Sequence, residues 1–230
     1  MSFIVIEGVD GSGKATQTRL LKQKLTTEYH KTVGTISFPS YGTPGAYFVE
    51  QFLNGKYGNL DTIDEKLASM FYTLDRFDKK AEITDKIREN DFLISDRYSI
   101  SSFIHRGVKY LEQQDIDGLE QFFSWLKERE FTRAGLPHPD KIIFLSLSLE
   151  NQKYLLEQKA KETREYVDMQ GGEALDMAES DLHHQELSLR VGKEILPQYF
   201  ENYHSIDCDN PNGGILTPEE ITAKILQEIL

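Results

Sequence analysis

The feature that most constrains this chain is a glycine-rich loop between an apolar run and a helix-forming run. Residues 8–14 read Gly-Val-Asp-Gly-Ser-Gly-Lys and follow the apolar residues 3–6, which is the context that a G-x-x-x-x-G-K loop requires. Glycines allow a tight backbone whose N–H groups point at phosphate oxygens, and the helix that follows adds its positive end. Lys14 would supply a mobile charge to the β- and γ-phosphates. The residues predicted to hold a nucleotide are Gly8, Val9, Asp10, Gly11, Ser12, Gly13, Lys14, Ala15 and Thr16.

Ala15 departs from this pattern, in which Ser or Thr usually places a hydroxyl on Mg²⁺. Thr16 follows, but its side chain begins one position further round the helix. The loop is similar to that of adenylate kinases, which have Gly-Lys-Gly-Thr-Gln where residues 13–17 here read Gly-Lys-Ala-Thr-Gln. A small residue after the lysine is therefore compatible with an active enzyme.

Short apolar runs alternate with longer amphipathic segments along the chain. Residues 3–6, 33–37, 92–95, 142–147 and, more weakly, 204–206 are typical of strands buried in a parallel sheet. Helices are predicted between them, among others at 16–29, 64–88, 182–203 and 218–230. We therefore expect an α/β fold of the P-loop NTPase type, with three α/β/α layers and a central, mainly parallel five-stranded sheet. The length of 230 residues predicts a single domain spanning 1–230.

The charge balance and the single cysteine narrow the possible partners. With 38 acidic against 26 basic residues, the formal net charge is −12, so we expect no nucleic-acid partner. Cys208 is the one cysteine, which excludes an intramolecular disulfide and a cysteine-rich metal site and fits a reducing compartment. The N-terminus lacks a basic n-region, and no stretch approaches the roughly 20 apolar residues of a membrane-spanning helix. We expect a cytoplasmic protein with no membrane partner.

Four further motifs follow the loop along the chain. They are Phe38-Pro39, Tyr72 with Arg76, Asp96-Arg97-Tyr98 and Leu-Pro-His-Pro-Asp at 136–140. With the loop and in this order, they make residues 3 to about 149 resemble the thymidylate kinases, and a basic segment near 159–180 matches the family's mobile lid more loosely. The resemblance implies transfer of the γ-phosphoryl group of Mg-ATP to dTMP, with ATP and Mg²⁺ required and a homodimeric assembly.

Asp96 and Arg97 come at the end of the apolar run 92–95. The fold would place Asp96 beside the phosphate loop, where a carboxylate can orient Mg²⁺ directly or through water. Arg97 would reach the crevice at the carboxyl end of the strand, and by resemblance it lies between the donor and acceptor phosphates. A surface Asp-Arg pair that merely closes a strand is the alternative.

Tyr72 and Arg76 are four residues apart on a predicted helix, so their side chains share one face. By resemblance the ring of Tyr72 stacks on thymine, Arg76 hydrogen-bonds the edge of the base, and Phe38 lines the same pocket. A core aromatic residue beside a surface arginine is the alternative. Phe71 takes the place of Tyr72 if the helix is rotated.

The resemblance also assigns residues around the acceptor's sugar. Asp10 matches a carboxylate near the 3′-hydroxyl, and Ser101 matches a serine that lines the acceptor site. Residues 104–107 read Ile-His-Arg-Gly where many bacterial relatives have Ala-Tyr-Gln-Gly. This change puts His105 near the sugar and Arg106 beside the base, and it leaves the identity of the acceptor open.

A catalytic cation is expected from the lid segment, about 159–180. Some thymidylate kinases carry an arginine in the phosphate loop, but Gly11 occupies that position here. Lys159, Lys161 or Arg164 would then supply the charge, and Arg164 is the first choice because its fork can bridge two phosphates. A solvated surface loop is the alternative for this segment.

Three other functions remain open at this point. A regulatory GTPase is suggested by the D-x-x-G pattern at residues 115–118, although no Asn-Lys-x-Asp element accompanies it. A silent nucleotide-binding protein is suggested by Ala15 and the altered acceptor pocket. A kinase for another nucleotide or deoxynucleoside would use the same donor site.

Overall fold

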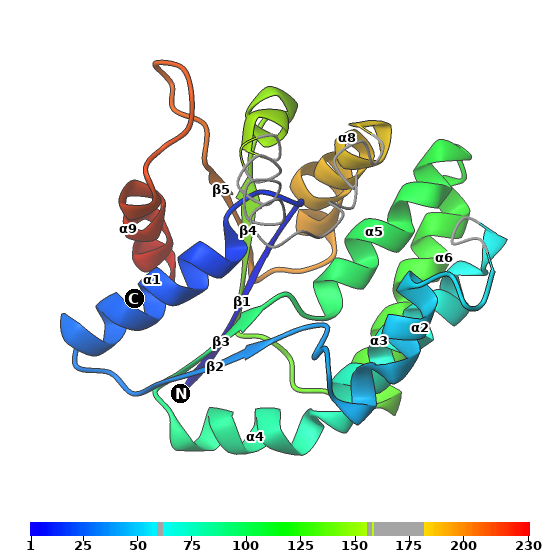
Figure 1. Ribbon diagram of the computed structural model, residues 1–230, viewed down its shortest axis with the longest axis horizontal. Helices are drawn as coiled ribbons and strands as arrows, with labels where there is room; N and C mark the ends of the chain where they lie inside the picture. The colour runs from blue at the N-terminus through cyan, green and yellow to red at the C-terminus, as the bar shows by residue number, and fades with distance from the viewer. Residues whose placement is uncertain (59–61, 156–157, 159–181) are drawn as a thin grey trace, which may run out of the picture.

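The computed structural model describes residues 1–58, 62–155, 158 and 182–230 (Figure 1). Its strands are β1 (Ser2–Gly8), β2 (Val33–Ser37), β3 (Phe92–Asp96), β4 (Lys141–Ser146) and β5 (Tyr203–Asp207). They form one five-stranded sheet in the order β2-β3-β1-β4-β5, and every neighbouring pair is parallel. The predicted α/β fold is confirmed, and the five predicted strands agree with the observed ones within two residues at each end.

The central strand β1 is apolar on both faces because each face is covered by helices. Phe3 and Val5 belong to the core on one side, whereas Ile4 and Ile6 belong to the core on the other. All four side chains are at most 1% exposed. This alternation divides the domain into three layers.

The helices are distributed over the two faces of the sheet (Figure 1). One face is covered by α1 (Lys14–Thr27) and α9 (Pro218–Ile229), whose apolar residues pack against Ile4 and Ile143. The other face carries α4 (Lys80–Glu89), α5 (Ser99–Glu112) and the π-helical segment η4 (Val191–Ile195), which follows α8 (Leu182–Arg190). Helix α6 (Ile116–Lys127) packs on the outside of α5.

Two predicted helices were too long. The segment 64–88 forms α3 (Glu65–Asp78) and α4, which are separated at Lys79. No glycine or proline marks this break; α3 packs against α2 (Tyr47–Leu53) and α5, whereas α4 packs against β2 and β3. Tertiary packing therefore overrides a continuous helical pattern.

The predicted helix 182–203 also ends early. Helix α8 is followed by the π-helical segment η4 and then by the short 3₁₀ helix η5 (Leu196–Gln198), which has a proline in its first turn. Gly192 lies in η4, and a Cβ at this position would approach the ring of Phe144 to 2.3 Å. The backbone of η4 therefore packs directly on strand β4.

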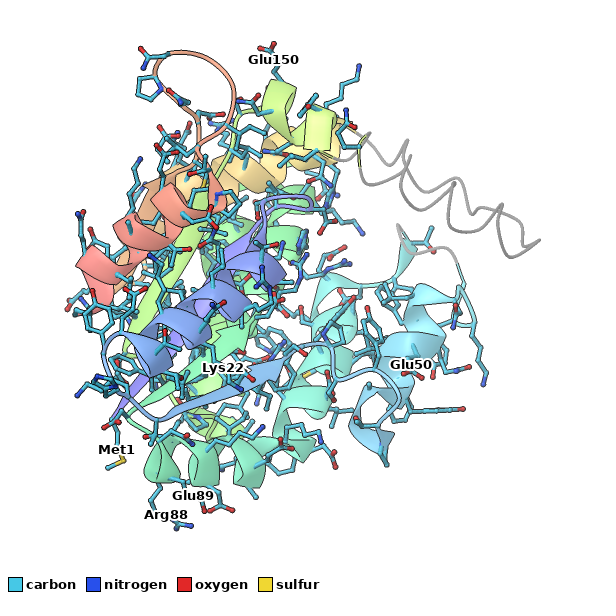
Figure 2. All side chains as sticks on the ribbon, turned by 60° about the vertical axis from the view of Figure 1, so that its left-hand side comes forward. Met1, Lys22, Glu50, Arg88, Glu89 and Glu150 are labelled. Carbon is cyan, nitrogen blue, oxygen red and sulfur yellow. The ribbon has the colours of Figure 1, made fainter. Side chains whose placement is uncertain are left out.

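The strands all run in one direction, which defines the edge where a ligand would bind. Figure 2 shows Met1, Arg88 and Glu89, which precede strands, at one end of the molecule, and Glu150, which follows β4, at the opposite end. Loops at the carboxyl ends of parallel strands form the ligand-binding crevice of open α/β sheets. Within the part of the chain that the structure describes, no helix is long and apolar enough to cross a membrane.

Candidate active site

The phosphate loop begins where β1 ends and leads directly into α1. Gly8 has φ of +153°, and a Cβ there would lie 2.5 Å from the Oγ of Ser12 and 2.9 Å from the carbonyl oxygen of Leu145. Gly13 precedes α1 in a left-handed conformation, with φ of +88°. Both positions therefore require glycine, and the predicted strand-loop-helix context is confirmed.

The loop has a donor set that suits phosphate oxygens. Lys14 is the first residue of α1, and its Nζ donates to the carbonyl oxygens of Gly8 at 3.0 Å and Val9 at 2.8 Å. The Oγ of Ser12 is buried and has no hydrogen-bond partner among the described residues. A buried ammonium, an unpaired hydroxyl and a backbone concavity that a Cβ would fill are the groups that an anionic phosphate would satisfy.

The pKa of Lys14 is set by its burial and by the charged groups around it. Burial and the nearby positive charge of Arg97 lower the pKa of Lys14 to about 8, whereas Asp10, Glu7 and Asp96 act in the opposite direction. The amine therefore titrates close to neutral pH, and an anionic ligand would favour its charged form. Ala15 is exposed and Thr16 is half-buried.

Asp96 ends β3, and it pairs in register with Ile6 of β1. Burial raises the pKa of its carboxyl group, while Lys14 and Arg97 oppose the rise. Among the described residues, no group of three or more His, Cys, Asp or Glu side chains could hold a metal ion. A Mg²⁺ ion here would have to rely on nucleotide oxygens and water, with Asp96 as a single carboxylate, which Mg²⁺ chemistry permits.

Arg97 connects the phosphate loop with helix α5. Its Nη2 forms an ion pair with Asp10 in the loop, and its Nη1 lies 3.4 Å from both the Oγ of Ser101 and the Nε2 of His105. The Arg97 side chain is 21% exposed, so a ligand can reach it from solvent, although Asp10, Ser101 and His105 contact it. The structure thus brings together four predicted site residues from three segments: Asp10, Arg97, Ser101 and His105.

Burial and neighbouring charges shift the pKa values of both Asp10 and His105. Burial pushes the pKa of Asp10 up, but Arg97, His105 and Lys14 outweigh it and hold the pKa at about 2. Burial, reinforced by Arg97, holds the pKa of His105 well below its ordinary value. At neutral pH the site therefore contains an ionised Asp10 and a neutral His105, whose ring stacks on His184 of α8 with centroids 5.8 Å apart.

Tyr72 lies among arginines in the predicted base pocket. Burial raises the pKa of Tyr72, whereas the positive charges of Arg106, Arg76 and Arg97 oppose the rise. Arg106 forms an ion pair with Glu65 at 3.4 Å and places its Cζ 5.7 Å from the ring centre of Phe52, on which Tyr72 also packs edge-on. Tyr72 and Arg106 therefore border the same aromatic cluster.

Two residues predicted for this pocket are more deeply buried than the sequence indicated. Phe38 is 5% exposed and packs against the ring of Tyr98 in the core. Arg76 is 2% exposed, so the alternative that placed this arginine on the surface is wrong. Phe71, the substitute considered for Tyr72, stacks with Phe48 of α2.

Arg76 is held by a buried carboxylate that the sequence did not reveal. Its Nε and Nη2 donate to both oxygens of Glu130, at 2.9 and 2.5 Å, in the π-helical segment η3 (Glu128–Arg133). Its Nη2 also donates to Ser102 and its Nη1 to the carbonyl oxygen of Tyr98. Glu130 raises the pKa of Arg76 against the opposing effect of burial. Contact of Arg76 with a base stays a prediction, and it would depend on the one remaining N–H of Nη1.

Comparisons with known proteins identify the family of this chain. The family model described as thymidylate kinase matches residues 6–171, which is more than half of the chain. The chain belongs to the thymidylate kinase family. The match begins within β1 and includes the phosphate loop, Asp96, Arg97 and helix α5.

Individual relatives show how far the similarity extends. The chain is 33% identical to a thymidylate kinase of Mycobacterium tuberculosis over 152 residues, 64% of this chain and 67% of that protein. It is 28% identical to human thymidylate kinase over 148 residues, 64% of this chain and 62% of the human protein. The alignments therefore cover about two thirds or less of these relatives. A structure of thymidylate kinase from Candida albicans superposes with a TM-score of 0.70 at 23% identity, covering 99% of this chain and 90% of that one, which supports the fold.

Sequence reasoning missed several residues that organise the site. Glu7 is fully buried beside Arg97 and contacts Ser101. Asp75 accepts a hydrogen bond from the backbone N–H of Ser40 at 2.9 Å and another from its hydroxyl, which fixes the loop after β2 to α3. A carboxylate within an apolar strand was the available signal for Glu7; nothing local distinguished Asp75 or Glu130.

The D-x-x-G pattern has a structural explanation. The carboxylate of Asp115 accepts a hydrogen bond from the backbone N–H of Gly118 at 2.9 Å and caps the start of α6. This is the ordinary role of aspartate at a helix N-terminus. The pattern therefore gives no support to a GTPase.

The basic residues predicted in the lid segment, Lys159, Lys161 and Arg164, lie outside the described residues. The catalytic role predicted for Arg164 stays a prediction.

Proposed function

We propose that this protein phosphorylates dTMP to dTDP with Mg-ATP as the phosphoryl donor. The observation that carries the proposal is Arg97, whose guanidinium pairs with Asp10 of the phosphate loop and approaches Ser101 and His105 of α5. A cation between the two substrates is what transfer of a phosphoryl group requires. Membership of the thymidylate kinase family supports the same reaction.

The proposed mechanism uses positioning and charge, with no covalent enzyme intermediate. Lys14, the loop N–H groups and the start of α1 bind the β- and γ-phosphates. Arg97 neutralises charge on the transferring group while a phosphate oxygen of dTMP attacks the γ-phosphorus and ADP leaves. Mg²⁺ would neutralise the β- and γ-oxygens, held by ATP, water and Asp96. Arg164 is proposed to add a second cation from the lid, whose closure would exclude water.

The acceptor is proposed to bind between α3 and α5. Tyr72 stacks on the base, Asp10 faces the 3′-hydroxyl of the sugar, and Ser101 and His105 border the sugar and phosphate. Arg106 is the observation that favours a second candidate acceptor, because its guanidinium lies beside Phe52 and the Tyr72 cluster. A cation there could hydrogen-bond a base other than thymine.

We also propose that the protein is a cytoplasmic homodimer. Helix α3 exposes Leu67, Leu74 and Phe77, each at least 42% exposed. A row of exposed apolar side chains on one helix is typical of a surface that pairs with another chain, and a second copy is the partner we propose. Light scattering at micromolar concentration tests this, with Leu74→Glu expected to give a monomer.

One assay tests the reaction. ADP formation from Mg-ATP is measured against a panel of nucleosides and nucleoside monophosphates. We expect the highest kcat/KM with dTMP and only slow ATP hydrolysis without an acceptor. Arg97→Ala serves as the control for contaminating kinases. A protein that is inactive with every acceptor, or that prefers a nucleoside, would contradict the proposal.

A further inference from the structure

Glu7 is a buried carboxylate that the proposed mechanism does not use. It is the last side chain of β1 before Gly8 and the phosphate loop, and it is 0% exposed. Burial raises its pKa, while Arg97, Ser101, Tyr98 and Lys14 oppose the rise. Burying a carboxylate in a strand costs free energy unless hydrogen bonds or opposite charges compensate for it.

The partners of Glu7 are the first residues of α5. This helix begins after Tyr98, which provides no side-chain cap, so its first N–H groups need acceptors from elsewhere. The Oε1 of Glu7 accepts hydrogen bonds from the backbone N–H groups of Tyr98 at 2.8 Å and Ser101 at 3.1 Å. Its Oε2 accepts one from the hydroxyl of Ser101 at 2.7 Å. Glu7 therefore caps α5 from another segment, and its negative charge lies at the positive end of that helix.

Arg97 lies directly before this cap in an unusual backbone conformation. Its φ is +66°, in the left-handed region that non-glycine residues rarely occupy. Its N–H donates to the carbonyl oxygen of Ile6 at 3.0 Å, and its own carbonyl accepts from the hydroxyl of Ser95 at 2.5 Å. Consecutive residues of β1, Ile6 and Glu7, thus hold the backbone on both sides of the Arg97 side chain.

We propose that Glu7 is a positioning residue for phosphoryl transfer, which ties the start of α5 to the phosphate loop and so aims Arg97 and Ser101 at the reacting groups. The inference rests on the proposed function. It assigns Glu7 an action through Arg97 and not a contact with substrate. Because Glu7 and Gly8 are adjacent, the residue that precedes the loop also hydrogen-bonds the start of α5.

Two substitutions of Glu7 test separately the loss of its charge and the loss of its hydrogen-bond acceptors. Glu7→Gln keeps the carbonyl oxygen that can accept from Tyr98 and Ser101, but it removes the charge. We expect kcat to fall about tenfold, the effect of weakening one charge-assisted hydrogen bond, with KM for ATP changed less than about threefold. Glu7→Ala removes the acceptor of the Tyr98 N–H and one of the two acceptors of the Ser101 N–H, which keeps the carbonyl oxygen of Tyr98 at 3.3 Å. It also removes the partner of the Ser101 hydroxyl, and we expect kcat to fall by at least about 100-fold. If the alanine variant does not fold, the glutamine variant still tests the proposal.

A matched control lies at the other end of the same strand. The carboxylate of Asp140 accepts a hydrogen bond from the backbone N–H of Phe3 at 2.7 Å. Asp140→Asn removes the charge of a carboxylate bound to β1 far from the loop, so we expect lower thermal stability with unchanged kcat. Equal losses of kcat in Asp140→Asn and Glu7→Gln would show that the Glu7 effect is a general loss of stability, and would overturn the proposal.

The decisive experiment is a double-mutant cycle between Glu7→Gln and Arg97→Ala, read as kcat with dTMP and Mg-ATP. Since Glu7 acts through Arg97, the double variant should be no slower than Arg97→Ala alone. Losses that multiply, or a Glu7→Gln variant with wild-type kcat, would overturn the positioning role while leaving the kinase assignment intact. A wild-type protein that phosphorylates no acceptor would overturn both, so the two failures are distinguishable.

Discussion

The donor and acceptor sides of the site are built in different ways. On the donor side, Lys14 hydrogen-bonds Gly8 and Val9, at most six residues away. On the acceptor side, Arg76 is held by Glu130, which is 54 residues away, and Arg97 by Asp10, 87 residues away. The donor side is therefore a local motif, whereas the acceptor side exists only after distant segments have packed together.

This difference has consequences for substitutions. Replacing a polar residue of the phosphate loop would remove a group proposed to contact the substrate without removing an apolar side chain of the core. Replacing a residue of the network around Arg76 would remove a buried partner, so we expect it to act first on folding. The two sides should therefore separate in experiments that measure stability and turnover independently.

The largest expected effect is on stability, from Glu130→Ala on the acceptor side. Arg76 would keep a buried charge without its counter-ion, and removing one member of a buried ion pair typically lowers the free energy of unfolding by about 3–5 kcal/mol. Urea denaturation followed by circular dichroism measures this. The control is Glu128→Ala in the same segment, whose pair with Arg133 is exposed and should contribute less than about 1 kcal/mol. Equal losses of unfolding free energy in the two variants would show that the buried pair of Arg76 and Glu130 does not stabilise the acceptor side as we expect.

The second prediction concerns Lys14→Ala on the donor side. We expect kcat to fall by at least about 100-fold, because one oriented charge on the transferring group contributes that much. The circular dichroism spectrum should be unchanged, and the midpoint of urea denaturation should not fall. Near-wild-type turnover in a folded variant would contradict the donor site, and a large loss of stability would show that Lys14 also holds the loop together.

The third prediction tests the base pocket. We expect kcat/KM for dTMP to exceed that for dUMP by roughly 10- to 200-fold, the range that one methyl group in an apolar pocket supplies. Tyr72→Ala should raise KM for the acceptor much more than KM for ATP, and steady-state kinetics with each substrate varied measure both. A preference for dCMP would instead point to His105 and Arg106 as determinants of a different specificity.

The fourth prediction uses the lowered pKa of Lys14, about 8 in the folded protein against 10.5 ordinarily. Only the charged amine attracts phosphate, so kcat/KM for ATP should fall about tenfold per pH unit well above pH 8. The stability contribution has the opposite sign. Between about pH 8 and 10.5 the unfolded state binds more protons at this group, so wild type should gain stability with rising pH relative to Lys14→Met. A kcat/KM that stays constant to pH 9.5 would contradict the assignment.

The smallest expected effect is that of Ala15→Ser. Mg²⁺ keeps several waters, so a missing hydroxyl ligand can be replaced by water. The substitution should change kcat by less than about tenfold, which is under roughly 1.4 kcal/mol in the barrier. Asp96→Asn should lower kcat far more, since it removes a charge as well as a ligand. A Mg²⁺ titration of activity compares the three proteins, and a wild type activated only by Ala15→Ser would identify a silent nucleotide-binding protein.

Much of the fold could be predicted because its signals are local. Five apolar runs predicted the five strands, and the helix predicted at 218–230 agrees with α9, which begins with a capping box at Thr217. The break at Lys79 could not be predicted, because no glycine or proline lies near it. There the direction of the chain is decided by the different surfaces on which α3 and α4 pack.

The residues of the candidate site also fall into two groups, those predicted from local signals and those that depend on tertiary packing. Asp10, Lys14, Arg97, Ser101 and His105 were predicted and lie together. Arg76 was predicted as a pocket residue, but its burial depends on Glu130, and no spacing in the sequence relates the two. Glu7 carried a weak signal as a charge within an apolar strand, yet its partners at the start of α5 are 91 and 94 residues away.

The sequence by itself determined the phosphate loop, the alternation of strands and helices, and the identity of the groups that can bind phosphate. These follow from glycine conformations, apolar spacing and side-chain chemistry, which act over a few neighbouring residues. Only the tertiary structure decided which carboxylate pairs with which arginine, where α3 ends, and how α5 is capped. Hydrogen bonds and ion pairs depend on distances through space, and those distances exist only once the sheet has brought distant segments together.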